Sequence, residues 1–500
     1  MPDWRDEFIK EGLTFSDVSL RPQYSDLETR AEKEGGPTTA TNLTAKIKLA
    51  IPIISANMDT VTESKMAIAM ARYGGIGIIH RYCSVKKQVE EVKKVKTVEE
   101  GIIRKPYTLN PFDSICRARE LMAEHQVDSV LIIDTGIGKR FLGLITKYEI
   151  ARADNSEVVG KYMKPREQLI VVEIDKFLFT EKKAKELAEN VFKEQPLLGK
   201  LPFVDMQGEL LGLMTKKDLF RYASFTNATK DESGRLCVGA AIGIGEKELR
   251  RAEELFHAGA DVLVLDVAHG HASKPMDMAR AIKVSFRNTN FELIVGNVAT
   301  SEAVRDWARL GFAAAIKVGI GPGATCSTRI VAGAGVPQVS AILDCAREAQ
   351  KYDIPIIADG GIRFPRDLSI AIACGASTVM IGTMLAGTDE SPGEIIEENG
   401  RLVKIVRGMS SLDVNLGIKG DDFITAGLKD IIQPEGIAGR VPYRGPLIRV
   451  LGALVSGLRS GMTYVGTKTI EDLKTPIPYK FTRMSQAAWE ESKPHDIEII

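Results

Sequence analysis

The sequence predicts an α/β fold, a (β/α)8 TIM barrel into which a smaller unit is inserted. Three observations predict it. Eight short apolar runs occur along the chain, and the last six of them each end in Asp, Asn or Gly. Amphipathic stretches separate these later runs. An internal repeat lies between the second run and the third.

The eight runs have the composition of strands that are buried on both faces of a parallel sheet. They are Ile51–Ala56, Gly75–His80, Leu236–Gly243, Asp261–Asp266, Glu292–Asn297, Ala314–Gly319, Ile354–Asp359 and Thr378–Gly382. Helical patterns such as Glu246–Ala258 and Pro365–Ala373 lie between them. Eight strands suffice for a closed barrel, whose site lies at the carboxyl ends of the strands. A doubly wound open sheet is the alternative.

The middle of the chain contains the repeat. Leu142-Gly-Leu-Ile-Thr-Lys-Tyr-Glu149 recurs 69 residues later as Leu211-Gly-Leu-Met-Thr-Lys-Lys-Asp218, and each copy has a β-αα-β-like pattern. Such a repeat indicates two copies of one small module that bury a shared face. We therefore expect residues 1–103 to form the first part of the barrel, 104–222 the inserted pair, and 223–500 the second part.

Composition limits the partners and the compartment. The 500 residues are 44% hydrophobic and 26% charged, as is typical of a globular protein. Lys+Arg and Asp+Glu both number 66, and this balance predicts no nucleic-acid or membrane-surface partner, because such proteins are normally basic. The N-terminus lacks the apolar region of a signal peptide, and the six cysteines form no CxxC pair. We expect a cytoplasmic protein with reduced thiols.

The strongest indication of chemistry is the segment Lys317-Val-Gly-Ile-Gly-Pro-Gly-Ala-Thr-Cys-Ser-Thr328, which contains a predicted strand end. Its alternate glycines leave few side chains, so that backbone groups can approach a ligand or an ion. Cys326 stands at the end of this loop, where a nucleophile with the Thr328 hydroxyl nearby would be placed. A lone cysteine is more often buried and inert, but its combination with the glycine loop favours a catalytic role.

Two further glycine turns follow predicted strands, at Asp359-Gly-Gly361 and at Gly382-Thr383. The loops after the last two strands of a barrel often bind phosphate through backbone N–H groups. The Asp359 carboxylate can accept two hydrogen bonds from a ribose diol. Tight turns with a solvated carboxylate are the alternative interpretation.

Six motifs occur in order along the chain. They are Ser55-Ala-Asn-Met-Asp59, Asp266-Val-Ala-His269, Gly296-Asn297-Val-Ala-Thr, the Cys326 loop, Ala358-Asp359-Gly-Gly and Gly408-Met409-Ser-Ser. Together they resemble the motifs of the IMP dehydrogenase/GMP reductase family, and the resemblance covers essentially the whole chain. Residues 104–222 resemble the tandem CBS (Bateman) domain of that family.

The resemblance implies an NAD(P)-dependent oxidoreductase in which Cys326 attacks C2 of a purine nucleotide and forms a covalent thioimidate. Thr328 would assist proton transfer, and Glu435, in Pro-Glu-Gly, would meet the purine edge. The residues expected to bind the substrate, GMP or IMP, are Asp359, Gly361, Gly382, Thr383, Gly408 and Met409. Those expected on the cofactor side are Asp266, Asn297 and His269.

The resemblance also implies a bound monovalent cation, K+. The carbonyls of Gly321, Gly323 and Cys326 match one half of the family's cation site, and Glu491 and Ser492 resemble the half that a neighbouring subunit provides. A homotetramer is expected, or an octamer linked through the CBS domains.

In CBS pairs a Thr-x-x-Asp sequence commonly contacts the ribose of a nucleotide. Thr215 and Asp218 match this pattern, and Thr146 and Glu149 match it with Glu in place of Asp. The inserted pair is therefore expected to bind ATP or GTP as an allosteric ligand.

The two activities of the family differ at C2 of the purine. A dehydrogenase oxidises IMP to XMP with NAD, and an Arg-Tyr pair on a flap activates the hydrolytic water. The segment between Gly408 and Gly436 contains neither Arg nor Tyr, and Asp422-Phe423 falls near the expected place. General-base assistance is worth about 10²–10⁴-fold. We therefore predict an NADPH-dependent GMP reductase, which has no such need.

Two alternatives stay open. Gly439-Arg-Val-Pro-Tyr-Arg-Gly445, Asn297-Val-Ala-Thr and the C-terminal cation segment resemble dehydrogenases, so IMP dehydrogenase is the second hypothesis. A catalytically silent, nucleotide-sensing relative is the third. His269 and His271 form a His-x-His pair, but without a third ligand this gives only weak support for a metal site.

Overall fold

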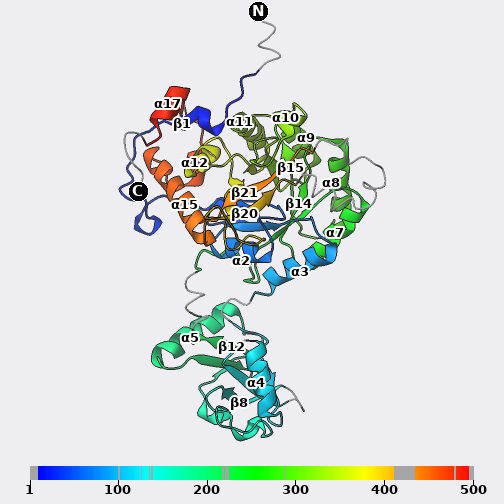
Figure 1. The fold of residues 1–500 in the computed structure, drawn as a ribbon, viewed down its shortest axis with the longest axis vertical. Helices are drawn as coiled ribbons and strands as arrows, with labels where there is room; N and C mark the ends of the chain where they lie inside the picture. The colour runs from blue at the N-terminus through cyan, green and yellow to red at the C-terminus, as the bar shows by residue number, and fades with distance from the viewer. Residues whose placement is uncertain are drawn as a thin grey trace, which may run out of the picture. The chain divides into compact units, whose positions relative to one another are not determined.

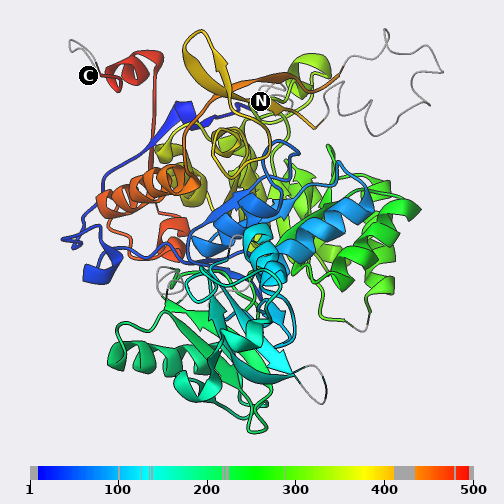
Figure 2. The same cartoon turned by 60° about the horizontal axis from the view of Figure 1, so that its bottom comes forward.

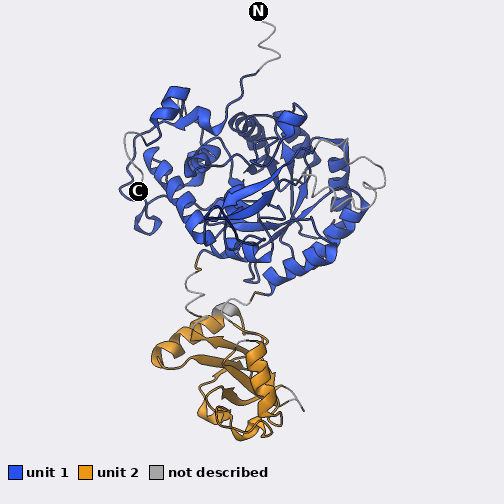
Figure 3. Ribbon diagram, in the orientation of Figure 1, with its two compact units in different colours: residues 1–97, 227–500 blue, residues 98–226 orange. Residues whose placement is uncertain are grey.

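The chain forms two compact units in the computed structural model, which are coloured separately in Figure 3. The structure describes residues 10–98, 102–125, 127–134, 136, 139–216, 219, 225–287, 289–409, 434–477 and 480–494. Unit 1 contains Met1–Thr97 and Asn227–Ile500, and unit 2 contains Val98–Thr226. Unit 2 is thus longer than the predicted insertion of residues 104–222. One reason is that Ile102 is buried in the core of unit 2 and Ile103 pairs with Leu213.

Unit 1 contains a closed barrel of eight parallel strands, which confirms the predicted fold class. In barrel order the strands are β13 (Gly239–Ile242), β14 (Val262–Asp266), β15 (Leu293–Val298), β16 (Ala315–Val318), β17 (Ile356–Asp359), β18 (Thr378–Ile381), β4 (Ile53–Ser55) and β5 (Ile76–Ile79). The barrel closes between β5 and β13, where Ile78 lies opposite Gly239. Each strand matches one predicted run, and β15 extends one residue beyond its run.

Apolar side chains from the strands fill the barrel interior. Ile54, Ile78, Val264 and Ile357 belong to one buried cluster. Leu43, Ile47 and Leu49, from the hairpin of β2 (Thr41–Asn42) and β3 (Lys48–Leu49), belong to the same cluster. The hydrophobic effect thus accounts for the short, β-branched strand sequences. Polar residues are left to the carboxyl ends of the strands, where barrel enzymes carry their sites.

Helices surround the strands, as Figure 1 shows. One long helix follows each barrel strand: α2 (Ser64–Arg72), α3 (Val85–Lys96), α7 (Glu246–His257), α8 (Ser273–Ser285), α9 (Ser301–Leu310), α11 (Gln338–Ala349), α12 (Pro365–Ala373) and α15 (Leu447–Tyr464). The helices predicted at Glu246 and Pro365 are confirmed, with α7 ending one residue early. Helix α15 approaches α12 closely, because a Cβ at Gly457 would lie 2.3 Å from Pro365 Cβ.

Shorter elements complete unit 1. Strands β19 (Ile396–Glu398), β20 (Arg401–Arg407) and β21 (Ala438–Pro442) form an antiparallel sheet, whose β19–β20 hairpin is visible in yellow in Figure 2. Strand β1 (Val18–Leu20) pairs with β22 (Phe481–Arg483). The short helices are α10 (Thr328–Val331), α13 (Thr383–Ala386), α16 (Ile470–Lys474) and α17 (Gln486–Glu491). The segment with Asp422-Phe423 lies outside the described residues.

Unit 2 contains two copies of a β-α-β-β module. The first has β6 (Thr108–Leu109), α4 (Ile115–Glu124), β7 (Ser129–Asp134) and β8 (Arg140–Thr146), with β9 (Lys164–Pro165) beside it; the second has β10 (Val172–Glu173), α5 (Glu181–Glu194), β11 (Lys200–Val204) and β12 (Leu210–Thr215). Side-chain oxygens of Ser114 and Thr180 cap the two helices equivalently. The shared core contains Leu131 and Phe141 from one copy and Val204 and Leu213 from the other.

The predicted β-αα-β pattern of each copy is therefore wrong for the described part of unit 2. Only one helix separates the first two strands of a copy. The chain then returns in an antiparallel hairpin, in which Leu131 lies opposite Leu144 and Leu201 opposite Met214. Between β11 and β12 the chain turns back at Asp205, whose carbonyl accepts the Gly208 N–H at 2.9 Å.

Among the described residues, no helix is both long enough and apolar enough to cross a membrane.

Candidate active site

Polar side chains at the carboxyl ends of four neighbouring strands meet around one buried lysine. Lys317 in β16 is 2% exposed. Its Nζ lies 3.0 Å from Asp266 Oδ1 and 2.7 Å from Asp359 Oδ2, and it donates a hydrogen bond to Asn297 Oδ1. Asn297 Nδ2 in turn donates to Asp359 Oδ2 at 3.0 Å and to Gly319 O at 2.8 Å. Strands β14, β15, β16 and β17 therefore place their polar residues in one cluster, which we call the Lys317 cluster.

The contacts set the charges within the Lys317 cluster. Burial opposes the charge on Lys317, but Asp359 and Asp266 outweigh this effect and raise the pKa of Lys317. Burial also opposes the charge on Asp266, but Lys317 and Arg81 lower the pKa of Asp266 below its usual value. Sequence reasoning named Asp266, Asn297 and Asp359 but missed Lys317. A lysine inside an otherwise apolar strand was the signal that could have found it.

The loop after β16 is shaped by glycine and held by Arg329. Gly319 has a φ of 153°, and a Cβ there would lie 2.1 Å from Asp359 O. Gly321 has a φ of +88°, in the left-handed region that favours glycine, and a Cβ there would lie 2.5 Å from Arg329 Cγ. Arg329 Nη2 donates to Val336 O and, at 3.4 Å, to Ile320 O. The backbone conformation of the glycines and the hydrogen bonds of the Arg329 side chain thus both hold the loop in place.

Three side chains form a connected path at the end of this loop. Cys326 is exposed, and its Sγ lies 3.2 Å from Thr328 Oγ1. Thr328 Oγ1 donates to Glu435 Oε2 at 2.8 Å. Backbone contacts hold the two segments together, because Ser327 N–H donates to Glu435 O at 2.9 Å and Cys326 forms a β-bridge with Gly436. The structure therefore joins Cys326, Thr328 and Glu435, which are 109 positions apart at most, into one connected path.

The predicted nucleotide-binding turns lie at the same end of the barrel. Gly360 and Gly361 follow β17 and have φ of +90° and +87°, so the backbone turns away from the strand direction there. Neither residue has a side chain beside its backbone N–H group. Gly382 and Thr383 follow β18, and a Cβ at Gly382 would lie 2.9 Å from Met58 Sδ. These positions fit a small anionic ligand that approaches the backbone closely.

Gly408 and Met409 follow β20 and lie beside the Cys326 loop. A Cβ at Gly408 would lie 2.7 Å from Thr325 O. Arg407 Nε donates to Asp59 Oδ2 at 2.7 Å, which ties the end of β20 to the loop after β4.

The loop after β5 contributes residues that sequence reasoning missed. Arg81 Cζ lies 4.9 Å from the centre of the Tyr82 ring. Burial and the nearby Asp266 charge raise the pKa of Tyr82. Arg81 also lowers the pKa of Asp266, after Lys317. Arg81 and Tyr82 are therefore coupled electrostatically to Asp266 of the Lys317 cluster.

Comparison with known proteins assigns this chain to a family. Residues 12–495 match the model of the IMP dehydrogenase / GMP reductase domain. The chain belongs to the IMP dehydrogenase/GMP reductase family. This confirms the resemblance of the motifs. Enzymes of this family are oxidoreductases of purine nucleotide metabolism and use nicotinamide nucleotide cofactors.

Some of the similar proteins are IMP dehydrogenases and others are GMP reductases. The IMP dehydrogenase of Aquifex aeolicus is 45% identical over 494 residues, which are 98% of this chain and 96% of the relative. The GMP reductase of Leishmania major is 42% identical over 497 residues, with 98% of both chains covered. A structure of Trypanosoma brucei GMP reductase in complex with guanosine 5'-monophosphate has a TM-score of 0.85 and 38% identity, and covers 99% of this chain and 100% of that chain. These similarities assign the family and the fold but do not separate the two reactions.

The predicted cofactor residue His269 lies with His271 in the loop between β14 and α8. The His269 and His271 rings are 6.4 Å apart, and His271 Nε2 lies 2.9 Å from Asp306 Oδ2. No group of three or more His, Cys, Asp or Glu residues suited to a metal ion occurs in the described part of the chain.

The predicted halves of the cation site lie on separate elements. Gly323 O accepts the Cys326 N–H at 3.0 Å, within the loop that also contains Gly321. Glu491 ends α17 and Ser492 follows it, with Ser492 Oγ donating to Ala488 O at 2.8 Å. Helix α17 packs near α12, where the Trp489 and Phe364 rings are 6.2 Å apart.

The predicted regulatory residues of unit 2 are only partly described. Thr146 ends β8, and both its N–H and its Oγ1 donate to Glu149 Oε2. Lys164 Nζ lies 3.1 Å from Glu149 Oε1. Thr215 ends β12, and Asp218 lies outside the described residues.

Proposed function

We propose that this protein is a GMP reductase, which uses NADPH to convert GMP to IMP and ammonia. One observation carries the choice within the family. The segment from Met409 to Gln433 contains no Arg and no Tyr, so it lacks the base that a dehydrogenase needs to activate water. A reductase needs no hydrolytic water, because hydride instead of hydroxide reaches C2.

The Cys326 path supports the chemistry of this reaction. Cys326 Sγ, as thiolate, forms a bond to C2 of GMP, and the bond from C2 to the 2-amino group breaks. The Thr328–Glu435 contact at 2.8 Å gives a route for the protons that ammonia takes as it leaves. NADPH, when bound beside Asp266, Asn297 and His269, would supply a hydride to C2. The C2–Sγ bond then breaks, and IMP leaves while Cys326 returns to its initial state.

The remaining site residues bind and orient the two nucleotides in this proposal. Asp359 would meet the ribose of GMP with Oδ1, since its contacts to Lys317 and Asn297 both use Oδ2. The backbone at Gly361, Gly382, Thr383, Gly408 and Met409 would hold the phosphate and the base. Asp266, Asn297 and His269 would face the nicotinamide. Lys317 would hold both carboxylates in place and lowers the pKa of Asp266.

IMP dehydrogenase is the second candidate function, with NAD as its cofactor and XMP as its product. It is favoured by the 45% identity to the Aquifex aeolicus enzyme. It is also favoured by Gly439-Arg-Val-Pro-Tyr-Arg-Gly445, which resembles dehydrogenases. A silent nucleotide-sensing relative is the third. The exposed thiol with a connected carboxylate argues for catalysis.

We further propose that K+ binds between subunits of a homotetramer, at the carbonyls of Gly321, Gly323 and Cys326 of one subunit and at Glu491 and Ser492 of the next. The donor set fits this ion, because it consists of oxygens and one carboxylate. Ion binding to these carbonyls would hold the backbone of the Cys326 loop, and with it the nucleophile, in place. Activity in K+ compared with activity in Li+ buffers tests this proposal.

Unit 2 is proposed to be a CBS pair that binds ATP or GTP at Thr146 and Glu149 and at Thr215 and Asp218. A structure of Trypanosoma brucei GMP reductase in complex with guanosine 5'-triphosphate, at 35% identity and a TM-score of 0.76, supports a purine triphosphate as a ligand within the family. Because Glu149 already accepts from Thr146 and pairs with Lys164, a ribose at this copy has to compete with these contacts. Calorimetric titration of the full chain with ATP and GTP tests binding, and no heat from either nucleotide contradicts it.

Initial rates of the two reactions, GMP to IMP with NADPH and IMP to XMP with NAD, test the proposed function. We expect NADPH oxidation that depends on GMP, and no NADH formation from IMP and NAD above that of Cys326→Ala. NADH formation from IMP that is faster than GMP-dependent NADPH oxidation indicates the dehydrogenase. No Cys326-dependent rate in either direction indicates the silent relative.

A further inference from the structure

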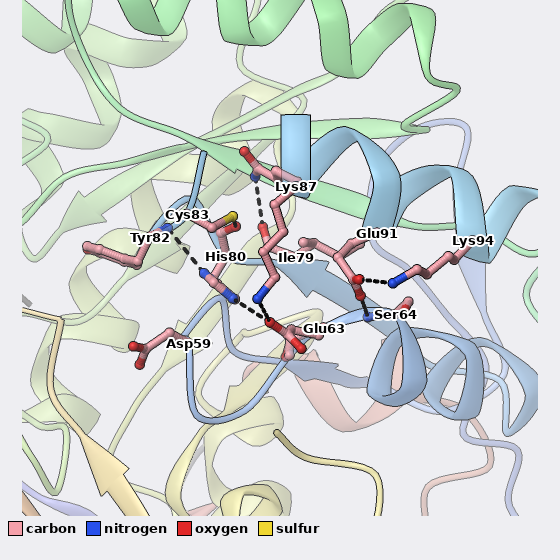
Figure 4. A network of polar contacts seen from close by, with 12 residues as sticks. Asp59, Glu63, Ser64, Ile79, His80, Tyr82, Cys83, Lys87, Glu91 and Lys94 are labelled. Atoms are coloured by element: carbon pink, nitrogen blue, oxygen red, sulfur yellow. Dashed lines mark hydrogen bonds and ion pairs between the residues drawn. The ribbon is translucent and has the colours of Figure 1, made fainter. Parts of the chain in front are cut away.

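A network of polar contacts holds the loop between β5 and α3, as Figure 4 shows. His80, at the end of β5, is 3% exposed, and its Nδ1 accepts a hydrogen bond from the Tyr82 N–H at 3.1 Å. On the other side of the ring, His80 Nε2 lies 3.6 Å from Glu63 Oε1. Lys87 Nζ, from α3, donates to the same Oε1 at 2.7 Å. Glu63 thus links the start of α2 to β5 and α3.

These contacts select one form of the His80 ring. A neutral imidazole has one donor nitrogen and one acceptor nitrogen. Because Nδ1 accepts from Tyr82, the ring proton stands on Nε2, which faces the Glu63 carboxylate. The contact with His80, and after it Lys87, lowers the pKa of Glu63 to about 2 although burial opposes this. Glu63 is therefore an anion, and an anion favours the tautomer with the proton on Nε2.

The loop that His80 holds carries two residues of the candidate active site. Arg81 lowers the pKa of Asp266, and the Asp266 charge raises the pKa of Tyr82, as described above. Arg81 also reaches the end of β13, because a Cβ at Gly243 would lie 3.0 Å from its Nη1. If the other tautomer of His80 formed, its Nδ1–H would face the Tyr82 N–H, and two donors would oppose each other. The loop would then have to move.

We propose that Glu63 and His80 are positioning residues of the reaction: Glu63 fixes the tautomer of His80, and His80 fixes the backbone at Tyr82 that presents Arg81 and Tyr82 to Asp266. The proposal rests on the proposed function for its kinetic consequence. It is independent of that function for its structural consequence, which is the protection of one backbone N–H. Neither residue touches the nucleotides in this account.

Hydrogen exchange followed by mass spectrometry tests the structural step. In Glu63→Ala the peptide that covers residues 80–84 exchanges at least about tenfold faster than in the parent protein. Glu63→Gln keeps an acceptor for Nε2–H and retains the protection. Lys87→Met removes only the second partner of Glu63 and also retains it. Glu91→Gln is the matched control, because Glu91 accepts the Ser64 N–H at 2.7 Å and pairs with Lys94 in the same network but does not contact His80.

Steady-state kinetics test the functional step. A misplacement of about 1 Å can cost about 10²-fold in rate, so Glu63→Ala is expected to lower kcat between about tenfold and a hundredfold. We expect it to raise the KM for NADPH but not the KM for GMP. Glu63→Gln recovers most of the activity, and Glu91→Gln has the activity of the parent.

The outcomes separate this inference from the proposed function. Unchanged exchange in Glu63→Ala overturns the inference whether or not the parent protein is active. Faster exchange with unchanged kcat and KM in an active protein also overturns it. A parent protein without activity in either direction refutes the proposed function, and the exchange data alone then decide whether Glu63 and His80 hold the loop.

Discussion

Replacing Lys317 with Met should destabilise the barrel and change its response to pH. The substitution keeps most of the apolar stem but removes the ammonium that lies 3.0 Å from Asp266 and 2.7 Å from Asp359. Asp266 and Asp359 then lose the lysine that pairs with both of them, although Arg81 still acts on Asp266. Removing one partner of a buried ion pair costs about 3–5 kcal/mol, so the free energy of unfolding should fall by about that amount at neutral pH.

The pH dependence follows from the shift of Asp266. In the parent protein the folded-state pKa of Asp266 is lowered, so its stabilising effect is present above the unfolded pKa and is lost as the pH falls. In Lys317→Met the largest of the contributions that lower the pKa of Asp266 is gone, so burial raises this pKa relative to the parent protein although Arg81 remains. The deficit of the variant therefore grows as the pH rises from the folded-state pKa of Asp266 in the parent to its higher pKa in the variant, and it should be smaller at about pH 5 than at about pH 8.

Urea unfolding followed by tryptophan fluorescence is a suitable assay, because Trp4, Trp307 and Trp489 all belong to unit 1. Lys404→Met is the matched control. Lys404 is also 2% exposed, but its Nζ donates to the carbonyls of Thr388 and Ser391 at 2.9 Å. The decrease in the free energy of unfolding caused by Lys404→Met should be the same at both pH values. A loss below about 1 kcal/mol for Lys317→Met, or one that is independent of pH, would refute the reasoning.

Three more predictions concern the site and the core. Thr328→Val and Glu435→Gln break the path from Cys326 and should each lower kcat by about 10²–10⁴-fold. The assay is GMP-dependent NADPH oxidation, and a loss of GMP affinity as large as the loss of kcat would indicate a structural role instead. Gly321→Ala should lower activity and thermal stability, because the site has a φ of +88° and Arg329 Cγ 2.5 Å from the new Cβ, whereas Gly439→Ala, with open space around it, should change neither. Burial lowers the pKa of Lys480 to about 8, so the unfolded chain binds more protons above that value, and stability should rise between about pH 8 and pH 10 by at most about 1.4 kcal/mol per pH unit; the same rise in Lys480→Met, measured by urea unfolding, would contradict it.

The sequence predicted the barrel well, because each strand is a short apolar run next to an amphipathic helix. The boundaries of unit 2 were predicted less well, since Ile102 and Ile103 look like part of a linker and pack only in three dimensions. The path from Cys326 to Glu435 was named from motifs. Its distances depend on a β-bridge between Cys326 and Gly436, which no local pattern encodes.

Two parts of the site escaped prediction for a physical reason. Lys317 interrupts a buried strand, and its partners come from three other strands. Glu63 and His80 meet only because β4 and β5 are neighbours in the barrel. Contacts of this kind are set by barrel geometry, and a pattern along one segment does not contain them.

Product analysis of a single turnover tests the central claim most directly. Enzyme is mixed with GMP and a limiting amount of NADPH, and NADPH oxidation, IMP and ammonia are measured together. The account predicts one IMP and one ammonia for each NADPH oxidised in the parent protein, and none of the three in Cys326→Ala. Formation of XMP and NADH from IMP and NAD, without release of ammonia from GMP, would contradict it.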